Sequence, residues 1–296
     1  MPIGELAAVL AAITWAVGSI FFARIGRTVP PGAMNLGKLF AAGLALTVTR
    51  LVVAPVAPLA TVPARAHGLL VLSAIAGLTI GDTAYFAAME AIGVSRAVLL
   101  LSAAPVFTAI GGYAFLGEQP NARSLLGIAV ILVGIVLVVL RPADPSLPRR
   151  PHAARGLVFG AISALGQASG SLLSRRAMQQ GIDPLAAGAG RVVVGGLVLL
   201  AVAVLTRKAR PWLESLARDR AWLSVASAAM IGSYGGIWLA QTGIARASSA
   251  GAAATLLATT PVFVVPIAHY SGVERATARA IAGAVVTVIG IATLTA

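Results

Sequence analysis

The sequence predicts an all-α integral membrane protein in which ten transmembrane helices form two inverted repeats of five helices each. Three observations lead to this prediction: an apolar composition with few charges, a series of apolar segments of membrane-spanning length, and a long stretch that occurs twice. The second half of the chain therefore reads as a second copy of the first.

The composition places the chain in lipid rather than in water. Its residues are 58% hydrophobic and only 10% charged, with a mean hydropathy of +0.93, whereas a soluble domain is about 25% charged. The net charge of +13 does not indicate nucleic acid, because nearly all basic residues lie between apolar runs, where they meet lipid headgroups. Cysteine is absent, which excludes disulfides and thiol chemistry.

Ten segments have the length of about 20 mostly apolar residues that an α-helix needs to cross a bilayer. The alternating pattern of barrel strands is not present, and helices are the other structure that pairs every backbone group within lipid. The first segment lacks a basic region before it, so we expect a retained helix rather than a signal peptide. The segments lie at 4–23, 32–52, 68–91, 95–116, 122–140, 156–176, 184–206, 221–244, 249–271 and 276–295.

The duplicated stretch is 98–140, which matches 254–296 without a gap at an offset of 156 residues. Twelve of the 43 positions are identical. A long-period internal match of this kind identifies a repeated structural unit. Because each copy holds five spans, the second copy enters the membrane from the opposite side, and the two are predicted to be inverted.

A short polar segment separates the copies. Residues 141–155 contain four prolines, which prevent a continuous helix. We therefore divide the chain into a first repeat at 1–140, a linker at 141–155 and a second repeat at 156–296. Within the second repeat, 207–220 is either an interfacial anchor built around Trp212 or an ordinary basic loop.

The orientation follows from the basic residues in the loops. A cytoplasmic N-terminus would leave six arginines in the inside loops and fourteen basic residues in the outside loops. Since inside loops normally carry the excess of basic residues, the count favours both termini outside.

Four ionisable residues lie well inside the predicted spans, where such groups are costly and usually functional. Asp82 is the carboxylate among them. It is either a cavity-facing group suited to reversible protonation or a static structural partner of Lys38 or Arg191. Tyr85 lies three residues further on the same helix face, and its amphipathic ring suits a cavity wall. The fourth residue, His269, is either a satisfied polar side chain or a proton relay.

Lys38 and Arg191 occupy matching positions in the two repeats, about two turns into their helices. Long basic side chains at this depth either reach back to the interface or face inward. If they face inward, two cations and one carboxylate give a net positive cavity, which favours anionic or zwitterionic substrates.

Further cavity candidates follow from comparing the repeats position by position. Matching places carry different side chains, as expected if the scaffold is repeated and the site is asymmetric. Aromatic residues near helix ends are alternatively interfacial. The matching pairs are Trp15 with Gln167, Tyr85 with Gln241 and Asp82 with Trp238.

Two prolines also match, Pro105 and Pro261, and each lies inside a predicted span. A proline removes a helix hydrogen bond, so each marks either a hinge or a fixed bend. Glu118 and Glu274 follow at the water boundary, where they cap the helices or gate a passage.

These features resemble the EamA repeat of the drug/metabolite transporter superfamily. The resemblance rests on a small residue followed by Pro-Val-Phe, a glutamate thirteen residues after the proline and a glycine nine residues further, all present in both repeats. The segment GDTAYF at 81–86, followed by Ala88, is similar to the third helix of many EamA members. The resemblance covers essentially the whole chain.

The resemblance implies a ten-helix carrier of the bacterial inner membrane with a central cavity, commonly one that exports metabolites or amino acids. Cytoplasmic termini, also typical of the family, conflict with the charge count. The chain departs from the family pattern where Gln167 replaces the counterpart of Trp15. The family further implies that helices three, four, eight and nine line much of the cavity, which favours Asp82, Tyr85, Trp238 and Gln241.

We therefore predict a secondary active transporter that exports small metabolites such as amino acids by alternating access between the repeats. Because no nucleotide-binding P-loop is present, a proton, ion or solute gradient would supply the energy. A passive facilitator or channel and an intramembrane enzyme are the alternatives. An aspartyl dyad needs a second carboxylate and a zinc protease needs HExxH, so no catalytic residue, metal or cofactor is assigned. Two inverted units in one chain can act as a monomer.

Overall fold

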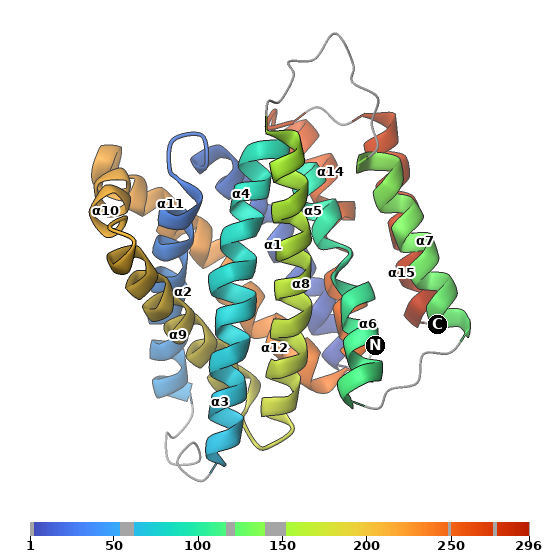
Figure 1. Cartoon of the computed structure of the whole chain (residues 1–296), viewed down its shortest axis with the longest axis horizontal. Coiled ribbons are helices and arrows are strands. Elements are labelled where there is room, and N and C mark those ends of the chain that lie inside the picture. The colour runs from blue at the N-terminus through green and yellow to red at the C-terminus, as the bar shows by residue number, and fades with distance from the viewer. Residues whose placement is uncertain are drawn as a thin grey trace.

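The computed structural model describes residues 3–53, 62–116, 122–139, 152–247, 250–274 and 277–295. These residues are almost entirely helical, and no β-strand occurs among them (Figure 1). Seven helical stretches in this part of the chain are long and apolar enough to cross a membrane, and shorter apolar helices cover Thr260–Tyr270 and Ala278–Gly290. The prediction of an all-helical membrane protein is confirmed.

The first half of the chain contains two helical stretches that are not plain α-helices. One changes to a π-helix and back, and another is broken near its middle. The elements are α1 (Ile3–Ile25), α2 (Pro31–Val53), α3 (Ala64–Ser73), η2 (Ala74–Gly81), α4 (Asp82–Ile92), α5 (Val94–Leu101), α6 (Ala104–Leu116) and α7 (Ala122–Val139).

Among the described residues, the second half repeats this order with two additional short helices, α10 and η3. Asp183 caps α9 by accepting a hydrogen bond from the backbone N–H of Ala186 (2.9 Å), and Pro184 occupies the first helical position. The elements are α8 (Ala153–Met178), α9 (Pro184–Leu205), α10 (Ala209–Ala217), η3 (Arg218–Arg220), α11 (Ala221–Ala229), η4 (Met230–Tyr234), α12 (Gly235–Arg246), α13 (Ala250–Leu257), α14 (Thr260–Tyr270) and α15 (Ala278–Thr295).

Irregular backbone occurs at matching places in the two halves. The π-helices η2 and η4 begin at Ala74 and Met230, which are 156 residues apart. The breaks at residues 102–103 and 258–259 are separated by the same offset. The predicted continuous helices at 95–116 and 249–271 are therefore each two helices in the structure.

The two prolines begin helices instead of bending them. Pro105 is the second residue of α6, and Pro261 is the second residue of α14. A proline is favourable there, because the N–H groups of the first helical turn have no partner within the helix. The prediction that each proline removes a mid-helix hydrogen bond is corrected accordingly.

Small residues bring the halves together. A Cβ atom built on Gly18 of α1 would lie 2.7 Å from the Cα atom of Gly232 in η4. In the matching contact, a Cβ atom on Gly170 of α8 would lie 3.0 Å from the Cα atom of Gly77 in η2. Each long first helix thus packs backbone to backbone against the π-helical stretch of the other half, as small residues allow in membranes.

Three helices lie toward the edges of the molecule in Figure 1. At the right edge α7 and α15 run side by side, and a Cβ atom on Gly134 would lie 2.7 Å from the backbone nitrogen of Thr287. At the left edge lies the short helix α10, which replaces the basic loop predicted as one alternative for 207–220. Its Trp212 ring fills the space that a side chain at Gly32 would need.

Parts of the predicted linker and boundary lie outside the described residues. These are residues 141–151 of the linker and Glu118. The chain is described again from His152, and α8 begins at Ala153.

Candidate functional site

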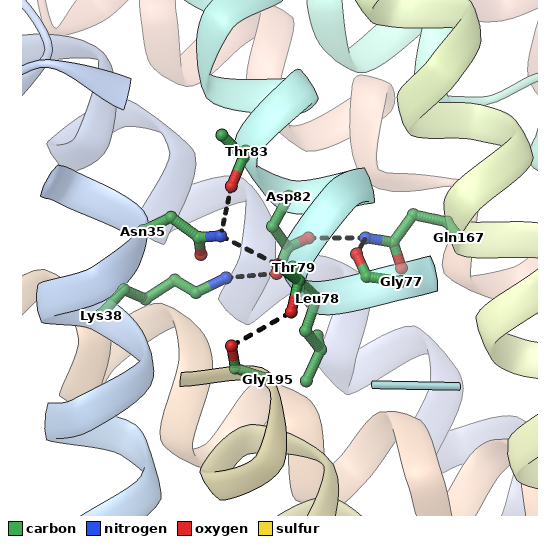
Figure 2. Close-up of polar contacts among 9 residues, drawn as sticks. All are labelled: Asn35, Lys38, Gly77, Leu78, Thr79, Asp82, Thr83, Gln167 and Gly195. Atoms are coloured by element: carbon green, nitrogen blue, oxygen red, sulfur yellow. Dashed lines mark hydrogen bonds and ion pairs between the residues drawn. The ribbon is translucent and has the colours of Figure 1, made fainter. Parts of the chain in front are cut away.

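The π-helix η2 is the element that sets the direction of Asp82. The backbone N–H of Asp82 bonds to the carbonyl of Gly77, five residues earlier, and Asp82 then begins α4. Side chains and backbone of α2, α8 and α9 hold η2 in place (Figure 2). The bonds run from Asn35 Nδ2 to Leu78 O (2.8 Å), from Gln167 Nε2 to Gly77 O (3.2 Å) and from Thr79 Oγ1 to Gly195 O (3.0 Å). Single π-helical turns inside α-helices occur frequently at functional sites.

Both oxygens of the Asp82 carboxylate have partners. Oδ2 forms an ion pair with Lys38 Nζ, and Oδ1 accepts a hydrogen bond from Gln167 Nε2 at 2.5 Å (Figure 2). The side chains of the ion pair are 6% exposed for Lys38 and 14% exposed for Asp82. Of the two cations considered as partners, Lys38 therefore forms the ion pair. Its ammonium also lies 5.3 Å from the centre of the Phe86 ring.

A central cavity opens beside this network, with an empty volume of about 1150 Å³ including its mouth. Residues of both halves line it, which places it between them. The polar lining comprises Ser19, Lys38, Asp82, Tyr85, Ser102, Thr108, Gln167, Ser171, Arg191, Ser233, Gln241 and Thr260. The larger apolar lining side chains are Trp15, Phe22, Leu78, Phe86, Val98, Leu101, Ile237, Ile244 and Leu257.

The two predicted cations both face inward. Lys38 and Arg191 are each only 4% exposed and line the cavity, so neither reaches back to the interface in this structure. The guanidinium of Arg191 lies between Gly77 and Gly170, and its Nε atom is buried without a hydrogen-bond partner among the described residues.

The structure also brings four other predicted residues to the cavity wall. The Tyr85 hydroxyl and the Ser19 hydroxyl are hydrogen-bonded at 2.9 Å. At the matching position in the second half, Gln241 accepts a hydrogen bond from the Ser174 hydroxyl at 2.5 Å. The complete set is Trp15, Tyr85, Gln167 and Gln241.

Trp238 and His269 lie elsewhere. The half-buried Trp238 packs against the apolar cluster that α2 and α9 share, and His269 is exposed at the end of α14, with its ring centre 5.5 Å from that of Tyr270. Sequence matching placed Trp238 with Asp82, but α12 presents a stripe three and four residues apart, and Trp238 falls beside it. The residues of this stripe are Ile237, Ala240, Gln241 and Ile244.

Several site residues were missed by the sequence interpretation. Asn35 is fully buried and bonds to both Leu78 O and Thr83 Oγ1, each at 2.8 Å. The sequence did contain a signal for Asn35, because it lies three residues before Lys38 and therefore on the same face of the helix. Ser19 also had a signal in its match to Ser171, whereas nothing in the sequence distinguished Phe22 and Phe86 from lipid-facing aromatics.

Phe22 and Phe86 separate the central cavity from a second one. Their ring centres are 5.0 Å apart, and both side chains line both cavities. The second cavity is lined by polar groups at the ends of α1, α4 and α14, including Arg27, Glu90 and Glu274. We call this second cavity the vestibule.

The halves are joined by polar contacts at the vestibule end. Arg24 Nη2 donates a hydrogen bond to Ser271 O at 2.7 Å, and the Ser95 backbone N–H donates to Glu274 Oε2 at 3.0 Å. Glu274 therefore links the start of α5 to the end of α14, instead of capping its own helix.

Family comparison decides the class of protein. The sequence model of the EamA-like transporter family matches residues 2–140 and 154–296, once in each half. The chain belongs to the EamA-like transporter family. This EamA-like protein is a multi-pass membrane transporter of the drug/metabolite type, and a small-molecule substrate and a lipid environment follow from that class.

A solved structure has a similar fold. It is described as "Crystal structure of protein", and its TM-score is 0.69 at 17% sequence identity, over 99% of this chain and 97% of that chain. At this identity the likeness shows the fold alone. No curated protein matches the EamA-like chain.

Proposed function

We propose that this EamA-like protein is a secondary active transporter that exports small metabolites, such as amino acids or related compounds, by alternating access. The observation that carries the proposal is the central cavity between the two halves, with a buried ion pair on its wall. A transporter that uses a gradient needs a site that two halves can expose in turn, and groups whose charge changes during the cycle.

The proposed architecture has ten spans in two inverted repeats related by a pseudo-twofold axis in the membrane plane. The contact between the two helix breaks supports it, because the Ser102 hydroxyl donates a hydrogen bond to the Ala258 carbonyl (3.3 Å). These residues are 156 apart and occupy matching positions in the repeats. Two equivalent residues that touch each other are expected close to such an axis, and both line the cavity.

The coupling that we propose uses Asp82. A proton on the carboxylate would remove the negative charge that holds Lys38 and would free Lys38 to move, together with the Phe86 ring beneath its ammonium. We place the protein in the bacterial inner membrane, acting as a monomer, with a proton or another ion as the coupling species.

Counterflow in proteoliposomes tests transport directly. Vesicles preloaded with one unlabelled amino acid at a time should transiently accumulate its labelled form, with initial rates that saturate as the outside concentration rises. A carrier exchanges solute in this way, whereas a channel dissipates the gradient without counterflow. Non-saturating flux, or the absence of counterflow for all twenty amino acids, would contradict an amino-acid carrier.

The Phe22–Phe86 pair is proposed as the barrier on the vestibule side. The chain has no cysteine, so a single Ser171→Cys variant reports access to the cavity through an impermeant thiol reagent. An aromatic pair contributes about 0.5–1.5 kcal/mol, so we expect Phe22→Ala to raise labelling from the vestibule side roughly two- to tenfold.

Phe21→Ala is the matched control, because Phe21 is the neighbouring residue but is 39% exposed and does not line the cavity. Its labelling should equal that of the parent. If the Phe22 and Phe21 variants are labelled equally from both sides, the Phe22–Phe86 pair is not the barrier.

A further inference from the structure

The positive and negative charges of the side chains on the wall of the central cavity do not cancel. In the described part of the chain they are Lys38, Arg191 and Asp82, so two cations and one carboxylate leave a net charge of +1. The Asp82 carboxylate already uses one oxygen for Lys38 and the other for Gln167. The surplus positive charge is therefore that of Arg191.

Arg191 has no direct partner for this charge in the part of the chain that the structure describes. Its side chain is 4% exposed and its Nε atom has no hydrogen bond, and the structure gives it no ion pair with a described residue. An uncompensated charge in a membrane interior is costly, and such charges mark substrate or ion pathways.

The space around the guanidinium is kept open by two glycines on different elements. A Cβ atom on Gly77 of η2 would lie 2.8 Å from Arg191 Nη2, and one on Gly170 of α8 would lie 3.1 Å from the same atom. A side chain at Gly77 would force the guanidinium to shift, and one at Gly170 would require it to give by a few tenths of an ångström. The backbone is thus shaped to hold this cation next to the cavity.

We propose that Arg191 binds a carboxylate group of the transported molecule. The planar fork of a guanidinium matches a carboxylate with two parallel hydrogen bonds, which a lysine cannot reproduce. Trp15, Phe22, Phe86 and Leu257 provide an apolar wall for the remainder of the molecule. The substrate class is therefore small carboxylates with an apolar tail, zwitterionic or anionic, and organic cations are excluded. This inference rests on the proposed function, since it takes the cavity as the transport site.

A head-group series tests the inference on purified full-length protein. One set shares the leucine skeleton: leucine, leucinamide, 4-methylpentanoate and 3-methylbutylamine. A second set shares the phenylalanine skeleton: phenylalanine, phenylalaninamide, 3-phenylpropanoate and 2-phenylethylamine. Ligands that bind the native state raise the melting temperature. We expect the compounds with a free carboxylate to do so, and the amides and amines to have no effect.

Two outcomes of this series would overturn the inference. One is binding of the amides or amines as tight as that of the carboxylates. The other is the absence of a shift with every carboxylate in both sets. The zwitterions and simple acids are compared within each skeleton, so a requirement for the ammonium group is measured separately.

Variants assign the effect to the residue. Arg191→Gln should weaken carboxylate binding roughly tenfold to a hundredfold, because a charge-assisted bidentate contact is lost. Arg191→Lys keeps the charge but loses the fork, and should retain part of the affinity. Gly77→Ala leaves Arg191 in the sequence but displaces its guanidinium, so it should weaken carboxylates selectively. Arg50→Lys is the control, since Arg50 is a buried arginine that pairs with Asp183 away from the cavity.

The binding series fails or succeeds independently of transport. If carboxylates bind through Arg191 but no counterflow occurs, the transport mechanism is wrong and the binding site stands. If Arg191→Gln binds carboxylates with unchanged affinity while counterflow persists, the binding site is wrong and the transporter stands.

Discussion

Asp82→Asn is expected to abolish counterflow, while the protein still inserts into the membrane. The change removes the carboxylate that holds Lys38 and that would carry a coupling proton. Removing one partner of a buried ion pair costs about 3–5 kcal/mol, so we also expect a lower melting temperature. The measurement is counterflow per folded protein, with folding monitored by size-exclusion chromatography in detergent.

The double variant Lys38→Met/Asp82→Asn separates coupling from simple structural pairing. It removes both charges, and replacing a buried pair by uncharged groups is often neutral or stabilising. We expect its melting temperature to recover and counterflow to remain absent. Recovery of counterflow together with transport driven by an imposed proton gradient would mean that the pair is only structural. Glu214→Gln is the matched control, because Glu214 pairs with Arg210 on exposed α10 and should not affect transport.

Gly18→Val is expected to prevent the folded protein from forming. Even the first side-chain atom at Gly18 would lie 2.7 Å from the Cα atom of Gly232 and 3.5 Å from its backbone nitrogen. Backbone atoms on both sides cannot move aside as a flexible side chain can, so α1 must separate from η4. Overpacking by one or two carbons already costs about 1–3 kcal/mol, and valine adds three carbons. Yield of monodisperse protein and melting temperature measure the effect.

Gly235→Val is the control for this change. Gly235 lies three residues from Gly232, and a Cβ atom there would meet nothing within 4 Å. The control should fold with a melting temperature close to that of the parent. Equal melting temperatures for the two valine variants would contradict the close approach of α1 and η4.

The helical segments could be predicted because a membrane span depends mainly on apolar length. The positions of irregular backbone could not be predicted from the sequence. The break after Leu101 has no glycine or charged residue beside it, and Pro105, which follows it, is equally compatible with a bend inside one helix. The break lies where the two halves meet through Ser102 and Ala258. The π-helix η2 likewise depends on contacts from three other helices, which are far away in the sequence.

The cavity residues show the same division. The sequence could predict that Lys38, Asp82 and Arg191 face a cavity or a partner, because burying an unpaired charge in a membrane is energetically costly. Which cation pairs with Asp82 depends on tertiary geometry. Matching by symmetry held for Tyr85 and Gln241, which both line the cavity, but failed for Trp238, which packs against the apolar cluster of α2 and α9 instead.

The direction in which the side chains of α4 point depends on the number of residues in the π-helix η2, which precedes Asp82. Each residue of an α-helix advances the chain by about 100° around its axis. Deleting one residue from η2 would therefore swing Asp82, Tyr85 and Phe86 together by about a third of a turn. The ion pair, the Ser19 contact and the ring beside the vestibule would all lose alignment at once, although none of these residues had changed. In this helix, a deletion of one residue is therefore expected to disturb the site more than a substitution of one residue.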